Sequence, residues 1–161
     1  MTIAEYNKTV DDHADGLYRF ILKNLGDSEN ARDVVQDSFE KLWTRISSVD
    51  SGKARSYLFT TAYHTMIDTI RKNKKTYDLD VEKHESPSRN DSYTGLSEIL
   101  EEAVNRLPID QRTVVLLRDY EGYRYDEIAY ITGLSESQVK VYIFRARMFL
   151  KSYIGSIETV I

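Results

Sequence analysis

Hydrophobic residues recur every three or four positions along most of this chain, which is the spacing of amphipathic helices. The pattern predicts a helix over 3–25, a second over 28–47 and a third over 54–74. The predicted core stripe of the second helix consists of Ala31, Val35, Phe39, Leu42 and Ile46. No segment shows the clear alternation of a half-buried strand, so we expect an all-α fold.

The helical pattern is interrupted once. Residues 76–94 have almost no apolar periodicity, are rich in Asp, Glu and Ser, and contain Pro87, which is typical of a mobile linker. Beyond them the pattern predicts four helices, over 96–106, 108–120, 125–132 and 136–153. The expected architecture is two small helical domains, 1–75 and 95–161, joined by the acidic flexible linker 76–94.

The last two predicted helices form a helix-turn-helix. Gly133 ends the first of them, since glycine adopts the left-handed conformation at little cost. Ser135 is placed as the N-cap of the second, and Gln138 lies three residues on, as in a capping box. At 100° per residue the buried side of this helix carries Val139, Ile143, Ala146 and Leu150. The opposite side carries Ser137, Lys140, Val141, Phe144, Arg145 and Met148, with Gln138 at its border.

This outward face is basic and partly apolar, and a helix of that kind fits the major groove of DNA. An ordinary solvated face would mix Glu with Lys rather than expose Phe144, Val141 and Met148. Exposed apolar groups favour a partner, so a protein-binding surface is the other explanation of this face.

Two further faces are candidates for binding. The third helix presents hydroxyls, an aromatic ring, a histidine and one arginine, a set that suits hydrogen bonding to and stacking on bases: Tyr57, Thr60, Thr61, His64, Asp68 and Arg71. Packing against another helix explains that face about equally well. The second helix presents Asp33, Gln36, Asp37 and Glu40, which suit either solvent or a basic protein surface.

Composition narrows the class of protein. The chain has 161 residues, no cysteine and a net charge of −4, which predicts weak nonspecific affinity for DNA. The acidic excess is concentrated in residues 76–104, with eight acidic and two basic side chains. No membrane span or signal peptide is visible, so we expect a cytoplasmic protein.

Nothing in the chain indicates an enzyme. His13, His64 and His84 lie far apart, and no glycine-rich phosphate loop or metal-spaced cluster occurs. We therefore expect no catalytic residues, metal, cofactor or small-molecule substrate.

Three segments together resemble the extracytoplasmic-function (ECF) sigma factors of bacterial RNA polymerase. Residues 30–43, NARDVVQDSFEKLW, resemble the region-two segment that binds the polymerase β′ clamp helices. Residues 54–72, ARSYLFTTAYHTMIDTIRK, resemble the segment that reads the minus-ten element. The sequence from RLPIDQRTVVLLRD through the helix-turn-helix, residues 106–150, resembles region four, which binds the minus-thirty-five element and the β flap.

The resemblance implies roles for individual residues. Those implied to face the clamp helices are Asp33, Gln36, Asp37 and Glu40. Those implied to face minus-ten DNA are Tyr57, Thr60, Thr61, His64, Asp68, Arg71 and Lys72. Those implied to contact the minus-thirty-five major groove are Ser137, Gln138, Lys140, Val141, Phe144 and Arg145, with Arg147 near phosphate. The resemblance further implies a membrane-bound anti-sigma factor that holds the protein inactive.

The sequence departs from the family at informative positions. Tyr57, Thr60 and Tyr63 stand where the family usually has Trp and several Arg, and Val141 and Tyr142 replace the usual Ser-Arg. The promoter sequence therefore cannot be copied from relatives. Two rivals to a sigma factor are a stand-alone transcription regulator, whose sensing or receiver domain residues 1–75 do not resemble, and an adaptor that binds only protein.

Overall fold

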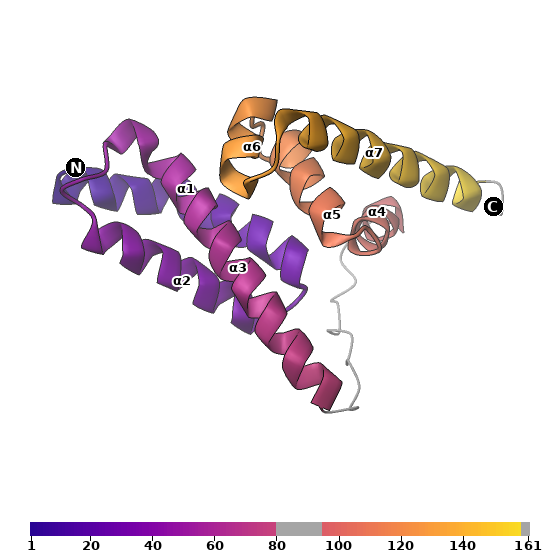
Figure 1. The fold of residues 1–161 in the computed structure, drawn as a ribbon, viewed down its shortest axis with the longest axis horizontal. Coiled ribbons are helices and arrows are strands. Elements are labelled where there is room, and N and C mark those ends of the chain that lie inside the picture. Colours follow the sequence, from indigo (N-terminus) through magenta and orange to yellow (C-terminus); the bar gives the residue numbers. More distant parts are fainter. Residues whose placement is uncertain (80–94, 159–161) are drawn as a thin grey trace. The chain divides into compact units, whose positions relative to one another are not determined.

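The computed structural model describes residues 1–79 and 95–158, and all of the regular secondary structure in these ranges is helical (Figure 1). The helices of the first part are α1 (Ile3–Leu25), α2 (Ser28–Thr44), the short 3-10 turn η1 (Ser51–Lys53) and α3 (Ala54–Leu79). Those of the second part are α4 (Gly95–Asn105), α5 (Ile109–Val115), the π-helical turn η2 (Leu116–Tyr120), α6 (Tyr125–Thr132) and α7 (Glu136–Glu158).

The helices divide into two compact units, α1–α3 and α4–α7. The predicted all-α fold with two helical units, and with the helix-turn-helix in the second, is confirmed. Helix α3 continues through Leu79, so the first four residues of the predicted linker are helical. The rest of the predicted linker, residues 80–94, lies outside the described residues.

In the first unit, three helices pack side by side around one core (Figure 1). Helix α1 begins at a capping box in which Thr2 and Glu5 bond each other's backbone, and it ends at Gly26 with φ 71°. Its apolar side meets α3, where the rings of Phe20 and Phe59 lie 5.4 Å apart. The largest fully buried side chains here are Leu17, Phe20, Ile21, Leu42, Leu58, Phe59 and Met66.

The core stripe predicted for α2 was wrong at Val35 and Ile46, which are only half-buried. Val34 and Ser38 are buried while Val35 is only half-buried. A serine can occupy the core here because its hydroxyl donates to the carbonyl of Val34 at 2.7 Å, which satisfies the polar group. Ile46 lies beyond the end of the helix at Thr44 and is half-buried.

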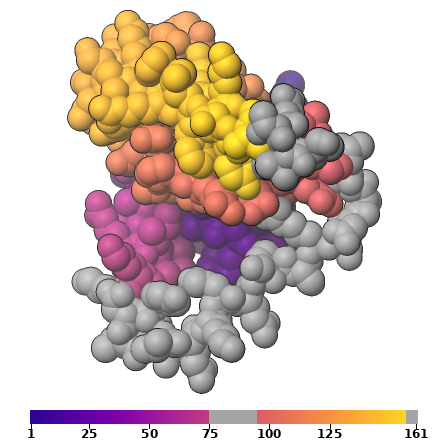
Figure 2. Space-filling model, turned by 90° about the vertical axis from the view of Figure 1, so that its right-hand side faces the viewer, coloured from indigo at the N-terminus to yellow at the C-terminus, as the bar shows by residue number. Residues whose placement is uncertain are grey.

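In the second unit, α7 packs along α4, α5 and α6. On the face drawn in Figure 2, the yellow side chains of α7 lie directly against those of the preceding helices. The core is formed by Leu107, Leu116, Leu117, Ile128, Ile131, Val139 and Ile143, all at most 1 % exposed. None of the helices in the described residues has a stretch long and apolar enough to cross a membrane.

The helix predicted over 108–120 changes its winding halfway. It starts after Pro108 as α5 and becomes π-helical at Leu116, where the amide of Glu121 donates to the Leu116 carbonyl at 3.1 Å. Gly122 then takes φ 76°, and the amide of Tyr123 closes the turn on the Leu117 carbonyl. This turn sets the path by which the chain enters the helix-turn-helix.

Candidate nucleic-acid interface

The corner of the helix-turn-helix has the geometry that its residues predict. Gly133 takes φ 76° and its amide donates to the Ala129 carbonyl at 2.9 Å, which ends α6. Ser135 caps α7: its hydroxyl accepts from the Gln138 amide at 3.1 Å, and its own amide donates to the Gln138 side chain at 3.0 Å. The side-chain oxygen of Gln138 is thus held by the cap.

Helix α7 presents its basic and apolar face to solvent. Val139, Ile143 and Ala146 are at most 1 % exposed and fix the rotation of the helix. On the other side Phe144 is 64 % exposed and Met148 53 %. The remaining predicted contacts Ser137, Lys140, Val141 and Arg145 are also exposed. An apolar ridge flanked by cations matches a partner that offers both methyl groups and negative charge.

The ring of Tyr125, at the start of α6, contacts two cations, Arg118 and Lys140, that lie far apart in the sequence. The guanidinium of Arg118 lies 4.6 Å from the centre of its ring, and the ammonium of Lys140 lies 5.7 Å from it. Arg118 also donates to the carbonyl of Tyr123 at 3.0 Å. Both distances are within the range of cation–π attraction, so the aromatic ring steadies Lys140 at the edge of the outward face.

Arg147 is held by a carboxylate. Its Nη2 and Nε lie 2.6 and 3.2 Å from the two oxygens of Asp119, on the π-helical turn. The hydrogen bond that Arg147 donates to Asp119 is the main cause that raises the pKa of Arg147, and Tyr125 adds to it. The residue predicted to lie near phosphate therefore has a protein partner in this structure.

The predicted minus-ten face of α3 is exposed along its second half only. His64, Asp68, Arg71 and Lys72 are exposed, whereas Tyr57, Thr60 and Thr61 are half-buried. The hydroxyl of Thr60 donates to the Ser56 carbonyl at 2.7 Å, so it is already bonded within its own helix. The hydroxyl of Tyr57 donates to the Lys41 carbonyl on α2 at 3.5 Å, so packing against a neighbouring helix accounts for part of this face.

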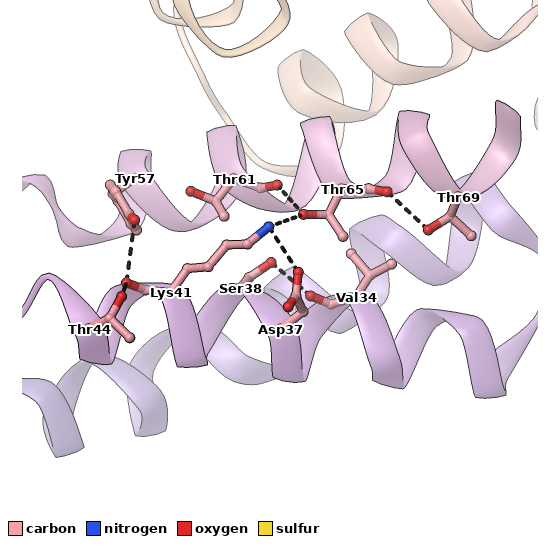
Figure 3. A network of polar contacts seen from close by, with 9 residues as sticks. All are labelled: Val34, Asp37, Ser38, Lys41, Thr44, Tyr57, Thr61, Thr65 and Thr69. Carbon is pink, nitrogen blue, oxygen red and sulfur yellow. Dashed lines mark hydrogen bonds and ion pairs between the residues drawn. The ribbon is translucent and has the colours of Figure 1, made fainter. Parts of the chain in front are cut away.

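The acidic face of α2 is linked to α3 by one lysine, as Figure 3 shows. The ammonium of Lys41 lies 3.0 Å from the Asp37 carboxylate and 3.3 Å from the Thr65 hydroxyl. The hydroxyl of Tyr57 donates to the Lys41 carbonyl at 3.5 Å. The other acidic-face residues, Asp33, Gln36 and Glu40, are exposed, and Gln36 donates to Glu40 at 3.5 Å.

Sequence reasoning missed an exposed aromatic residue beside this face. Trp43 is 48 % exposed, and its ring meets the ring of Tyr6 edge-on at 5.0 Å. Tyr6 is itself fixed by a hydrogen bond to the Phe39 carbonyl at 3.1 Å. The helical phase of α2 offered a signal, because Trp43 lies one residue past the buried Leu42.

No group of three or more histidine, aspartate or glutamate side chains in the described residues is arranged to hold a metal ion.

Comparison with known proteins assigns this arrangement to a family. Residues 9–76 match the family model of Sigma-70 region 2, and residues 97–150 match that of Sigma-70, region 4. The chain is 30% identical over 145 residues to the RNA polymerase sigma factor SigV of Bacillus subtilis, which covers 88% of this chain and 86% of the relative. It is also 30% identical over 158 residues to the ECF RNA polymerase sigma factor SigM of Bacillus subtilis, with 94% of each covered.

Two solved structures share the fold. The sigma factor RpoE of Bartonella quintana, crystallised with the anti-sigma factor NepR, superposes with a TM-score of 0.83 at 24% identity over 95% of this chain and 98% of that one. CnrH, solved with the cytosolic domain of CnrY, superposes with a TM-score of 0.69 at 22% identity, over 94% of this chain and 88% of that one.

The chain belongs to the sigma-70 family. Within that family it is an RNA polymerase sigma factor of the ECF type, which binds core polymerase and directs initiation at promoters by sequence-specific DNA binding. Sigma factors are initiation factors and not enzymes. The resemblance identified from three sequence segments is thus confirmed, and the stand-alone regulator and the protein-only adaptor are set aside.

Proposed function

We propose that the outward face of α7 reads the minus-thirty-five element, the outward face of α3 reads the minus-ten element, and the acidic face of α2 docks on the polymerase β′ clamp helices. The observation that carries the proposal is the exposure of Phe144, Arg145 and Met148 on the second helix of a well-formed helix-turn-helix. In domain terms, residues 1–75 act as region two, 76–94 as the linker and 95–161 as region four.

The α7 face supports a division of labour between its residues. Arg145 and Lys140 are exposed cations that suit base edges or phosphates, and Phe144 and Val141 suit thymine methyls and sugar carbons. The side chains of Gln138 and Arg147 are held by Ser135 and Asp119. We assign them to positioning the helix on the DNA and not to reading bases.

The α3 face is narrower than the sequence predicted. His64, Asp68, Arg71 and Lys72 are exposed and suit direct contacts with the minus-ten strand. Tyr57, Thr60 and Thr61 are half-buried, so they reach DNA only through one edge of the side chain. The hydroxyl and imidazole groups of the α3 face suit hydrogen bonding to unstacked bases.

The α2 face offers carboxylates to a basic partner. Asp33, Asp37 and Glu40 lie on the outward side of the helix, where complementary charge on the polymerase would increase the rate and specificity of docking. The second unit is assigned to the β flap, through the family role of region four. Since core polymerase works in the cytoplasm of bacteria, we place the protein there.

An anti-sigma factor is the other partner we propose. The structural neighbour from Bartonella quintana is bound to the anti-sigma factor NepR, and CnrH is bound to the cytosolic domain of CnrY. This chain shares their fold, and we propose that a membrane-bound anti-sigma factor binds it and holds it inactive.

The surfaces are tested separately with two probes. Holoenzyme is bound to two DNA probes. One is a duplex that carries only the minus-thirty-five element. The other is a forked DNA, called the fork below, that carries only a single-stranded minus-ten element. Substitution of Arg145 by Ala should weaken binding to the duplex alone, and substitution of His64 by Ala should weaken binding to the fork alone. If each variant weakened both probes equally, the assignment of separate DNA surfaces would be wrong.

A further inference from the structure

Lys41 occupies the seam between the acidic face of α2 and the minus-ten helix (Figure 3). Its ammonium is within 3.0 Å of the Asp37 carboxylate and donates to the Thr65 hydroxyl at 3.3 Å. That hydroxyl in turn donates to the carbonyl of Thr61 at 2.9 Å. The Lys41 ammonium therefore contacts Asp37, on the proposed polymerase surface, and Thr65, on the helix proposed to bind the minus-ten element.

The backbone of the same residue bonds α3 as well. The Lys41 carbonyl accepts from the Tyr57 hydroxyl at 3.5 Å and from the Thr44 hydroxyl at 2.8 Å. Tyr57 and Thr65 lie eight residues apart on α3, about two helical turns. Lys41 is therefore positioned along the edge of the face that carries Tyr57 and Thr61.

The ion pair is easily exchanged. The side chains of Lys41 and Asp37 are 51% and 42% exposed, and an exposed pair spaced by four residues contributes very little to stability. A stronger cation on a partner could therefore take the Asp37 carboxylate from Lys41 at small cost. A polymerase that binds the acidic face would supply such a cation.

We propose that Lys41 is a phosphate-binding residue of the minus-ten surface, which Asp37 holds in the free protein and which docking on core polymerase releases. The released ammonium lies beside Thr61 and Thr65, where a nucleic-acid strand on α3 brings its phosphates. The proposal rests on the polymerase and minus-ten surfaces proposed above. It explains why a basic residue stands within an otherwise acidic face.

The test compares Lys41→Met with the wild-type protein. Holoenzyme affinity for a fork with a single-stranded minus-ten element is measured at several salt concentrations. Loss of one phosphate contact should reduce the slope of log affinity against log salt by about 0.7 to 0.9 and weaken binding roughly three- to tenfold near 0.1 M salt. Lys41→Arg keeps the charge and should retain the wild-type slope.

A matched control is available on α1. Lys8 and Asp12 form an exposed ion pair of the same spacing, at 2.7 Å. Lys8→Met should leave the salt slope unchanged. Helicity and thermal unfolding of each free variant show whether folding is affected, and none of these exposed substitutions should shift unfolding by more than the control does.

The release by polymerase is tested through core affinity. Lys41→Met should bind core about twofold more tightly, because Asp37 no longer has to leave a partner. That gain should vanish in an Asp37→Asn background. A wild-type salt slope in Lys41→Met, or a loss of core affinity in that variant, would overturn the proposal.

Failure of the underlying surfaces gives a different result. Asp37→Asn and His64→Ala are measured in the same two assays. If these variants alter core and fork binding but Lys41→Met alters neither, only the role of Lys41 is wrong. If none of the variants alters either affinity, the polymerase and minus-ten surfaces themselves are wrong.

Discussion

Arg147 on α7 and Asp119 on the π-helical turn form a two-point ion pair, with the shorter contact at 2.6 Å. The pair ties α7 to the segment that leads into the helix-turn-helix. Because bidentate contacts fix direction as well as distance, Asp119 determines where the guanidinium of Arg147 points. The same carboxylate engages that guanidinium within the protein.

Replacing the Asp119 carboxylate should show separately how the ion pair affects stability and how it affects DNA binding. In Asp119→Asn, the free energy of unfolding should fall by no more than about 1 kcal/mol, because both side chains are substantially exposed. Affinity for duplex DNA of unrelated sequence should rise, since a cation is freed and an acid removed. Urea unfolding and fluorescence anisotropy measure the two quantities. Unchanged DNA affinity would show that Arg147 serves structure alone.

Arg145 should carry sequence recognition. It is exposed on the outward face of α7, so Arg145→Ala should weaken binding to the minus-thirty-five element by about 1–3 kcal/mol if the guanidinium reads a base. Affinity for core polymerase should not change. Lys151→Ala, an exposed cation on the same helix, serves as the control. Equal losses for the two variants would indicate a general effect of charge instead of base recognition.

Asp37 should matter for core polymerase. A lysine at this position would place like charges together if the polymerase surface is basic, so Asp37→Lys should lower core affinity by about tenfold or more. The same charge change in Asp12→Lys, on α1, is the control. Surface plasmon resonance with immobilised core measures both. Wild-type affinity in Asp37→Lys would remove α2 from the polymerase interface.

Gly133 should be required for conformational reasons alone. It has φ 76°, and a Cβ built there would meet no atom within 4 Å. Gly133→Ala should therefore cost about 1–2 kcal/mol of stability from the left-handed backbone. Gly52, which also has open space but no positive φ, provides the comparison. Equal urea midpoints for Gly133→Ala and Gly52→Ala would contradict this explanation.

His13 should make the first unit sensitive to acid. Burial is the main cause that lowers the pKa of this imidazole, and the charge of Arg55 lowers it further. The unfolded chain then binds a proton more readily than the folded one, so stability should fall as the pH drops through about 6.5 towards the lower folded value. His13→Gln should flatten the dependence of unfolding free energy on pH between 7.5 and 5.5, as measured by urea unfolding at each pH.

Much of the fold follows from local signals in the sequence. The bounds predicted for α1 and α6 agree with the structure, because Gly26 and Gly133 end these helices in left-handed conformations. The capping box of Ser135 and Gln138 was also predicted correctly. In these places the residue that ends or begins a helix acts on its immediate neighbours, so the sequence alone is sufficient.

The predictions from sequence fail where contacts between helices determine which side chains are buried and how the chain is wound. The stripe of α2 was misplaced because Ser38 is buried with its hydroxyl bonded to Val34, a choice that polarity alone argues against. The change to π-helical winding at Leu116 has no sequence signal that we recognised. Lys41 contacts Thr65 and Arg118 contacts Tyr125 across two different helical segments. Such contacts depend on how the helices pack and which rotamers the side chains adopt, and the hydrophobic periodicity of the sequence specifies neither.

The central claim is tested most directly by co-purification with bacterial core RNA polymerase, followed by run-off transcription on a library of genomic promoters. The account predicts saturable binding to core and new start sites that share two spaced promoter elements. Asp37→Lys should lower core affinity by about tenfold or more, and Arg145→Ala should reduce transcription from the new start sites. DNA binding that persists without any affinity for core would contradict the account.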